Sequence, residues 1–238
     1  MTLLDRHLAP TTNAIGFWEC PAERVRDEFV AWLRWLNRDV TVFEVNGSLD
    51  DAVAALRPLG ACPYRQLVFQ TSSQWTAYLD SGLRGTDTAS PIGHLCRVIP
   101  CRGLIARWVP HTRRKTETGW TGEYGIVDFD LLADHPAARL NTERAILMMN
   151  DGGPWKFHTV GDPLPFEQTE RYEAKKIRDR FTVDMLEEYC RAIGVEVFDE
   201  EFYGPRGYVI EQRFREPNGP AQRRPLDELL RLLRIPPR

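Results

Sequence analysis

Two aspartates offer the clearest acid–base chemistry in the chain. Asp128 and Asp130 flank Phe129 in a run whose alternating side chains predict a strand, so both carboxylates would lie on one face. Carboxylates placed in this way can bind Mg²⁺ or serve a hydrolase or nuclease. The solvent-exposed face of a half-buried strand carries the same residues without any ligand, so both interpretations stand at this point.

A second acidic candidate follows further along the chain. Asp162 and then Glu173-Ala174-Lys175 have the order of residues found in metal-dependent nuclease sites. That chemistry places the Glu-x-Lys on a strand, whereas the dense charge from 167 to 180 predicts a surface helix with i,i+4 ion pairs. Glu173 therefore joins the two aspartates only in an alternative hypothesis, a hydrolase or nuclease with a non-motif acidic site.

Metal, nucleotide and nucleophile motifs are missing from the sequence. His94, Cys96 and Cys101 make a partial set of zinc ligands, but Cys96 falls on the apolar stripe of a predicted helix and no Cys-x-x-Cys occurs. The glycine-rich loops of nucleotide-binding proteins and the Gly-x-Ser-x-Gly elbow of hydrolases are also absent. We therefore expect no metal, no cofactor and no catalytic residue.

Two polar segments, 81–88 and 111–124, have the composition of loops. Trp, Tyr and Arg side chains most often dominate the binding energy of protein interfaces, and loops on a rigid sheet are where recognition usually occurs. We predict that these segments bind a partner through Arg84, Asp87, Arg113, Arg114, Trp120, Glu123 and Tyr124.

The overall composition restricts the class of partner. The 238 residues are 42% hydrophobic and 27% charged, which is ordinary for a soluble globular protein, and the net charge of −3 gives no electrostatic reason to bind nucleic acid or an anionic membrane. The first twelve residues lack the apolar region that is typical of a signal peptide, so we expect none, and no run of roughly 18 apolar residues occurs. The five cysteines are scattered and odd in number, which indicates reduced thiols. We expect a cytoplasmic protein that binds another protein.

Hydrophobic periodicity and capping residues predict the elements that position these segments. Tight hairpins occur instead of βαβ crossovers, so the predicted class is α+β, with mainly antiparallel sheet and flanking helices. Hairpins are expected at about 66–80 and 145–160, and further strands at 14–18, 40–45, 103–109, 124–131, 195–203 and 207–214. Helices are expected at 21–36, 48–57, 90–99, 167–180, 182–193 and 225–235.

The two predicted hairpins follow one pattern, in which an apolar run and a polar turn lead to a Trp and a second strand. Trp75 and Trp155 are the residues in question. This repetition predicts two related α+β halves, residues 1–132 and 133–238. Trp favours strands in general, so chance repetition within one fused domain is the alternative.

Three short sequence segments resemble known proteins. They are Trp-Thr-Ala-Tyr-Leu-Asp at 75–80, Asn-Asp-Gly-Gly-Pro-Trp-Lys-Phe at 150–157, and Lys-Ile-Arg-Asp-Arg-Phe-Thr at 176–182. Over most of its length the chain resembles an uncharacterised bacterial family of soluble α+β proteins. It is similar in style to the immunity proteins of polymorphic-toxin systems. The resemblance implies a non-catalytic binding protein, in its most concrete form a cognate inhibitor that occludes a bacterial toxin, and it transfers no residue roles.

Overall fold

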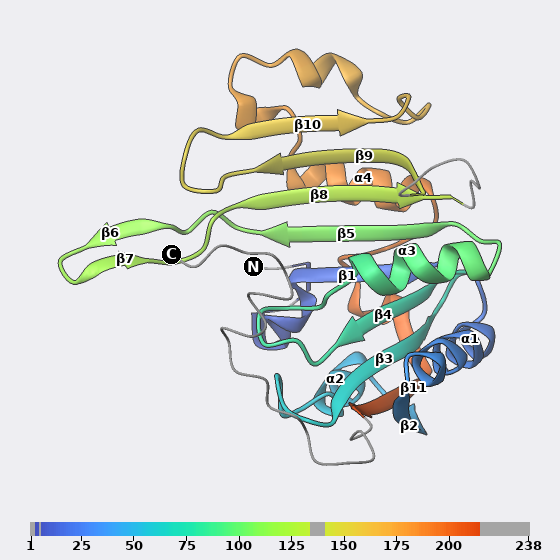
Figure 1. The fold of residues 1–238 in the computed structure, drawn as a ribbon. Helices are drawn as coiled ribbons and strands as arrows, with labels where there is room; N and C mark the ends of the chain where they lie inside the picture. The colour runs from blue at the N-terminus through green and yellow to red at the C-terminus, as the bar shows by residue number, and fades with distance from the viewer. Residues whose placement is uncertain (1–2, 5, 134–140, 215–238) are drawn as a thin grey trace, which may run out of the picture.

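A single nine-stranded antiparallel sheet organises the chain (Figure 1). The computed structural model describes residues 3–4, 6–133 and 141–214. The strand order is β10-β9-β8-β5-β1-β4-β3-β11-β2, and every pairing is antiparallel, which confirms the predicted α+β class. The strands are β1 (Ala14–Trp18), β2 (Arg38–Asn46), β3 (Tyr64–Thr71), β4 (Thr76–Asp80), β5 (Gly103–Val109), β8 (Ile126–Leu132), β9 (Thr142–Met149), β10 (Lys156–Val160) and β11 (Tyr203–Phe214).

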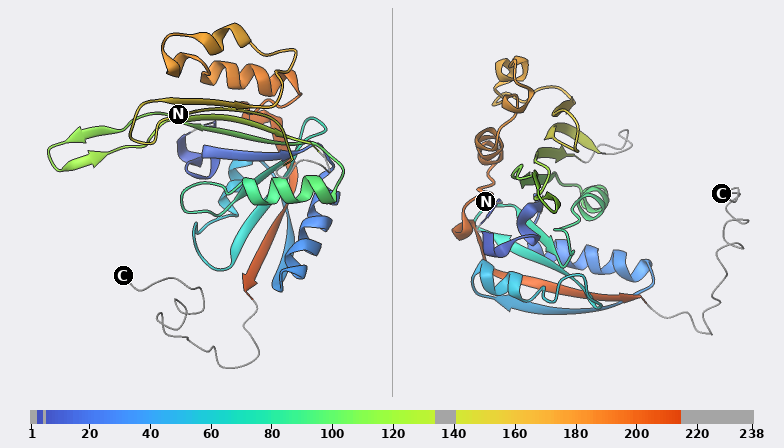
Figure 2. Two further views of the ribbon diagram at one scale, coloured as in Figure 1. Left: turned by 45° about the horizontal axis from the view of Figure 1, so that its top comes forward. Right: turned by 90° about the vertical axis from the view of Figure 1, so that its left-hand side faces the viewer.

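Helices cover both faces of the sheet, as the edge-on view shows (Figure 2). On one face pack α1 (Ala22–Trp35) and α3 (Ala89–Val98), which bury the predicted apolar stripes. On the other face lie α2 (Leu49–Ala54) and α4 (Val183–Ala192), whose apolar residues join the larger core. The sheet is therefore the middle layer between two hydrophobic cores.

Two glycines allow α3 to lie close against the sheet. A Cβ at Gly16 of β1 would come within 2.6 Å of the Ile92 side chain, and a Cβ at Gly103 of β5 within 2.4 Å of Cys96 Sγ. Any larger residue at these positions would push the helix away, because tightly packed interiors leave little room for extra methyl groups.

Capping residues mark the starts of α2 and α4 and the end of α4. Ser48 and Asp51 form a capping box at the start of α2. Thr182 accepts a hydrogen bond from the Met185 N–H at the start of α4, and Gly194, just after its end, has φ +86°. These signals depend on a few neighbouring residues, so they are readable without the tertiary structure.

Two predicted segments differ in the structure, and a third lies outside the part that it describes. The charged helix expected at 167–180 is instead two short 3-10 helices, Thr169–Glu173 and Ile177–Asp179, because too few apolar side chains are available to pack an α-helix onto the core. The loop expected at 111–122 contains a two-stranded ribbon. The helix expected at 225–235 lies outside the described residues.

The two strands expected at 195–203 and 207–214 are one strand in the structure. β11 begins at Tyr203 and continues through Gly204-Pro205 to Phe214. Its register with β3 shifts between Tyr203 and Gly207, so a bulge accommodates the proline while strand pairing resumes on both sides.

The predicted boundary at 132/133 falls between β8 and β9, which are neighbours in the same sheet. β11, from the second predicted half, lies between β3 and β2 of the first. Trp75 and Trp155 each precede the second strand of their hairpin, as predicted. However, β3–β4 is internal to the sheet and β9–β10 ends it. These unlike surroundings argue against a duplication, and the division into halves remains a prediction.

A buried ion pair fixes the segment that follows the last hairpin. Arg144 of β9 donates from Nε and Nη2 to the Glu167 carboxylate at 2.8 and 2.6 Å, and Arg144 and Glu167 have side-chain exposures of 2% and 0%. Arg144 Nη1 also donates to the Gly161 carbonyl, and Glu167 accepts from Leu164 N–H and the Tyr172 hydroxyl. Burial alone would raise the pKa of Glu167, but these hydrogen bonds hold it below its ordinary value.

We expect Glu167→Gln to lower the free energy of unfolding by about 3–5 kcal/mol, because Arg144 would remain buried without its carboxylate. Denaturant unfolding measures this loss. The matched control is Glu187→Gln, which breaks an exposed pair with Arg191 and should cost less than about 1 kcal/mol. Equal losses in the two variants would contradict a structural role for the buried pair.

Candidate functional site

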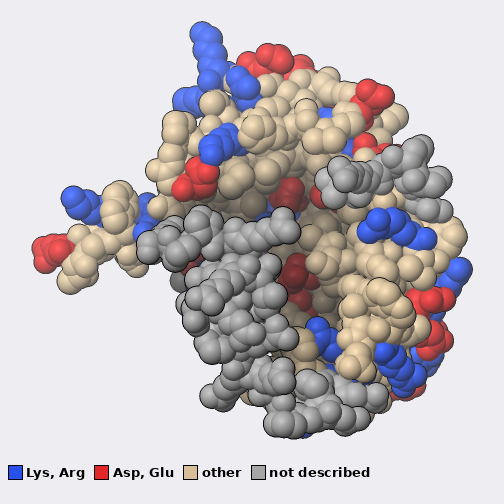
Figure 3. All heavy atoms as spheres, viewed as in Figure 1, with Lys and Arg blue, Asp and Glu red and all other residues tan. Residues whose placement is uncertain are grey.

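A two-stranded ribbon leaves the sheet between β5 and β8. It consists of β6 (Arg114–Thr116) and β7 (Gly119–Thr121), and every residue of both strands is exposed. Figure 3 shows it standing clear of the body, with Lys and Arg side chains along it and an acidic tip. An isolated hairpin is only marginally stable in water, so the ribbon depends on how its base is held.

Hydrogen bonds and ring contacts hold the base of the ribbon. The Glu123 carbonyl accepts the N–H groups of Thr112 and Arg113 at 3.0 Å each, and Thr112 Oγ1 accepts the Glu123 N–H at 3.0 Å. His111 Nδ1 accepts the Gly125 N–H at 3.2 Å, and its ring lies 5.4 Å from the ring of Trp155. Trp155 packs in turn against the larger core, the one on the α2 and α4 face of the sheet. The sheet and this core therefore fix the direction in which the ribbon points.

An arginine orders the aromatic side chains of the ribbon. The Arg113 guanidinium lies 5.0 Å from the ring centroid of Tyr124 and 5.8 Å from that of Trp120. Its Nη1 also donates to the Gly122 carbonyl at 3.1 Å. Trp120 is 62% exposed and Tyr124 41%. The rings are therefore both accessible and pre-arranged, which lowers the entropy lost when such residues enter an interface.

The structure gathers most of the predicted contact residues but not all of them. Arg113, Arg114, Trp120, Glu123 and Tyr124 lie together on the ribbon or at its base. The other predicted contacts belong to the loop 81–88, which follows β4 and lies against the body of the molecule (Figure 1). In that loop Arg84 is exposed, and the backbone of Asp87 binds the Asp80 carboxylate.

The aspartates Asp128 and Asp130 share one face of β8, as predicted. Phe129 between them packs in the main core, so both carboxylates point to the opposite face, where Arg107 Nε lies 4.0 Å from Asp128 Oδ2. Burial raises the pKa of Asp128 to about 7 and that of Asp130 to about 6, although Arg107 opposes both shifts. Asp130 Oδ1 is buried without a hydrogen-bond partner.

The structure does not bring Glu173 to this pair. Glu173 is exposed at the end of a 3-10 helix, and its neighbour Tyr172 packs against the core on the other face of the sheet. Within the described part of the chain, no group of three or more His, Cys, Asp or Glu side chains could hold a metal ion. The partial zinc set of the sequence therefore does not assemble there, and Cys96 is buried on α3 as its apolar stripe predicted.

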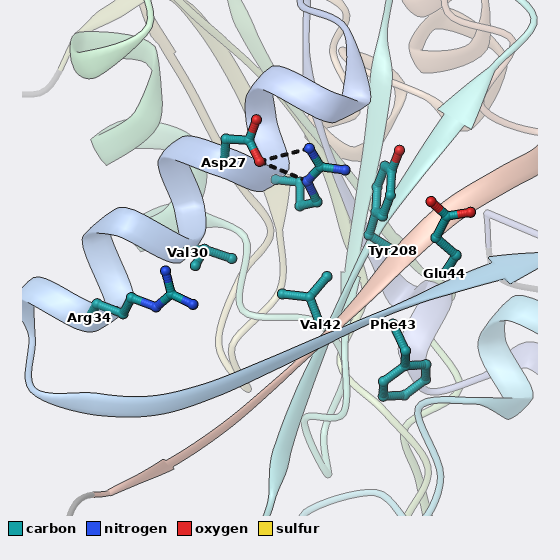
Figure 4. A pocket seen from close by; sticks show the side chains of 8 residues that line it. Asp27, Val30, Arg34, Val42, Phe43, Glu44 and Tyr208 are labelled. Carbon is teal, nitrogen blue, oxygen red and sulfur yellow. Dashed lines mark hydrogen bonds and ion pairs between the residues drawn. The ribbon is translucent and has the colours of Figure 1, made fainter.

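A hollow of about 530 Å³ lies between α1 and the edge strand β2 (Figure 4). Val30 and Val42 lie on its two sides, and Phe43 points away from it. Three of its charged groups have partners: Arg26 pairs with Asp27 at 2.7 Å and covers the Tyr208 ring at 4.4 Å, and Glu44 lies 3.6 Å from Arg206. This groove presents no arrangement that suits acid–base or nucleophilic chemistry.

Sequence reasoning missed a polar cavity under α1 and α3. Asp80 ends β4 with its carboxylate buried, and it accepts hydrogen bonds from the Gly82 and Asp87 N–H groups and from the Tyr78 hydroxyl. A signal was present in the sequence: Tyr64 and Gln66 are two residues apart in the first strand of the hairpin, and Tyr78 and Asp80 are two residues apart in the second. Each pair therefore lies on one face of its strand.

Comparison with known proteins finds no match to a family model, to a curated protein or to a solved structure. The resemblance to a bacterial family drawn from the sequence therefore stays a prediction. No helix in the described ranges is long and apolar enough to cross a membrane.

The aspartate pair predicts a pH dependence of stability. An acid whose pKa is raised in the folded state binds more protons folded than unfolded, so stability falls as pH rises from 3.8 toward about 7 and levels off above that. Changing both aspartates to Asn should remove a decline of roughly 4 kcal/mol between about pH 5 and pH 8, which denaturant unfolding measures.

The matched control is Asp151→Asn. Asp151 is exposed, and its hydrogen bond with Lys156 lowers the pKa of its carboxyl, so its titration lies below this pH window. This variant should keep the slope of the wild-type protein. A wild-type slope in the doubly substituted protein would show that the aspartates are not the titrating groups.

Proposed function

We propose that this is a non-catalytic binding protein that contacts a protein partner through the β6–β7 ribbon. The observation that carries the proposal is the ribbon itself, an exposed arm fixed at its base that presents ordered Trp, Tyr and Arg side chains. Residues of these types, clustered and pre-arranged, are typical of the centre of an interface. Nothing in the hydrophobic core requires them there, because both strands lie outside it.

The chemistry of the ribbon indicates the kind of surface that it fits. Trp120 pairs across the ribbon with Lys115, and Arg114 lies next to Lys115. A complementary partner has an apolar pocket for the indole, bordered by acidic groups. The most concrete form of the proposal is an immunity protein in the cytoplasm that blocks such a pocket on a bacterial toxin. Neither nucleic acid nor membrane takes part in it.

A second candidate function is a hydrolase or nuclease that uses the acidic face of β8. The observation in its favour is the pKa of Asp128, about 7, because a general acid or base works best when its pKa lies near the working pH. Glu173, the third residue of this hypothesis, lies elsewhere. The binding function is therefore the better supported of the two.

We expect Trp120→Ala to weaken partner binding at least about tenfold, since truncating a buried Trp anchor typically costs roughly 2 kcal/mol or more. The partner is sought as the product of the neighbouring gene and as a stoichiometric protein co-purified from the source cell. The dissociation constant is measured by calorimetry, and circular dichroism confirms that the fold is intact.

The matched control is Trp35→Ala, which truncates a Trp that is 79% exposed on α1 instead of on the ribbon. This variant should bind as the wild-type protein does. Equal binding by the Trp120 variant and the wild-type protein, with a partner in hand, would reject the ribbon as the contact surface.

The two functions are separated by the double variant Asp128→Ala, Asp130→Ala. These side chains lie on the face of β8 and not on the ribbon. We therefore expect that partner binding, and protection of the cell against the toxin, remain unchanged. A folded double variant that has lost all function would support the enzyme and reject the binding protein.

A further inference from the structure

A cavity of about 270 Å³ lies between the end of α1, the start of α3 and the sheet. Its helix side is apolar and includes Phe29, Trp32 and Leu33. Its sheet side is polar and includes Tyr64, Gln66, Tyr78, Asp80 and Gln212. Small-molecule sites commonly combine an apolar wall with a few placed polar groups in this way.

Gln66 is the unusual residue of the polar wall. Its side chain is on β3, the residue is 3% exposed, and its Oε1 atom is buried without a hydrogen-bond partner. A buried polar atom left without a partner costs roughly 1–3 kcal/mol, and folded proteins rarely keep one. Because an amide can be turned over, this group can accept or donate a hydrogen bond.

A buried donor belongs to another residue that lines the same cavity. Arg38 lines it, and its Nε is also buried without a hydrogen-bond partner. The Arg38 guanidinium is held over the Phe214 ring at 3.4 Å, so its position is defined. A second hollow of about 340 Å³ shares Arg38, Tyr64 and Gln212 with the cavity, which provides a route of entry from the surface.

Asp80 does not offer a free carboxylate to a ligand. Its Oδ1 accepts the Gly82 N–H at 2.8 Å, and its Oδ2 accepts the Asp87 N–H at 2.9 Å and the Tyr78 hydroxyl at 3.3 Å. These bonds fix the polar wall. The charges left to face a ligand are those of Arg38 and Asp87, which are opposite in sign, so a neutral molecule suits the cavity best.

The apolar wall is aromatic. The rings of Phe29 and Trp32 are stacked on each other with an interplanar angle of 21°, and Trp32 is stacked in turn on His94 at 4.2 Å. A planar aromatic ligand can pack against this group of rings with its edge toward Gln66 and Arg38. Stacking on an aromatic side chain is worth about 1–3 kcal/mol for a nucleic-acid base.

We propose that this cavity binds a small neutral heteroaromatic molecule, of the size of a nucleobase, that carries a hydrogen-bond donor and an acceptor on one edge. The Gln66 amide and the Arg38 Nε bond that edge, and Trp32 and Phe29 cover the ring. This site is separate from the ribbon, so its occupancy does not depend on the proposed protein partner.

The test is calorimetric titration of the full chain with adenine, with uracil and with indole, which has an N–H donor but no matching acceptor. At least one of the two bases should bind with a dissociation constant below about 1 mM, an affinity of about 4 kcal/mol, and more tightly than indole. Absence of binding by both bases, or tighter binding of indole, overturns the proposal.

Gln66→Leu should weaken binding of that base at least tenfold. The variant should fold at least as stably as the wild-type protein, because it removes a buried amide oxygen that has no hydrogen-bond partner, and thermal unfolding verifies this. The matched control is Gln70→Leu, on the same face of the same strand but lining a different hollow, which should bind normally. Unchanged binding in the Gln66 variant, or an equal loss in both variants, also overturns the proposal.

Discussion

The burial of β1 on both faces is the constraint on which the rest of the molecule depends. All five residues of this strand are buried, and it pairs with β4 on one side and β5 on the other. Trp18 packs against Phe29 of α1 on one face, and Phe17 lies near Tyr203 on the other. β1 is the central strand and connects the two halves of the sheet. It therefore positions the β5–β8 pair, which carries the ribbon, and the β3–β4 pair, which forms a wall of the cavity.

Buried polar groups in this structure are of two kinds. Some have all their hydrogen-bond partners within the protein and stabilise the fold, and others have an atom without a partner that a ligand or a proton can satisfy. Arg144 and Glu167 satisfy each other and the surrounding backbone, so they hold a segment in place and leave nothing for a ligand. Gln66 and Asp130 each keep a buried oxygen without a partner. Such atoms carry a cost in the folded protein, and a ligand or a proton can reduce it. The polar wall of the cavity and the acidic face of β8 are therefore the places where binding of a ligand or a proton changes the energetics most.

Short-range patterns were sufficient for most elements, and their failures have physical reasons. Apolar spacing and caps identified α1, α2, α3 and α4 because these signals act within a few residues. The run from 167 to 180 has the charge of a surface helix, but it lacks the apolar stripe that would hold it as one. β11 continues through a Gly-Pro pair because partner strands on both sides compensate for the break.

The sequence by itself determined the α+β class, the antiparallel hairpins, the shared face of Asp128 and Asp130, and the interface-like composition of 111–124, because each depends on local order. Only the tertiary structure decided that 111–124 forms a ribbon tied down by His111 and Trp155, residues far apart in sequence. It also placed Gln66 of β3, Trp32 of α1 and Asp87 of the loop 81–88 around one cavity. Such groupings arise from packing between distant segments, which residue spacing along the chain does not encode.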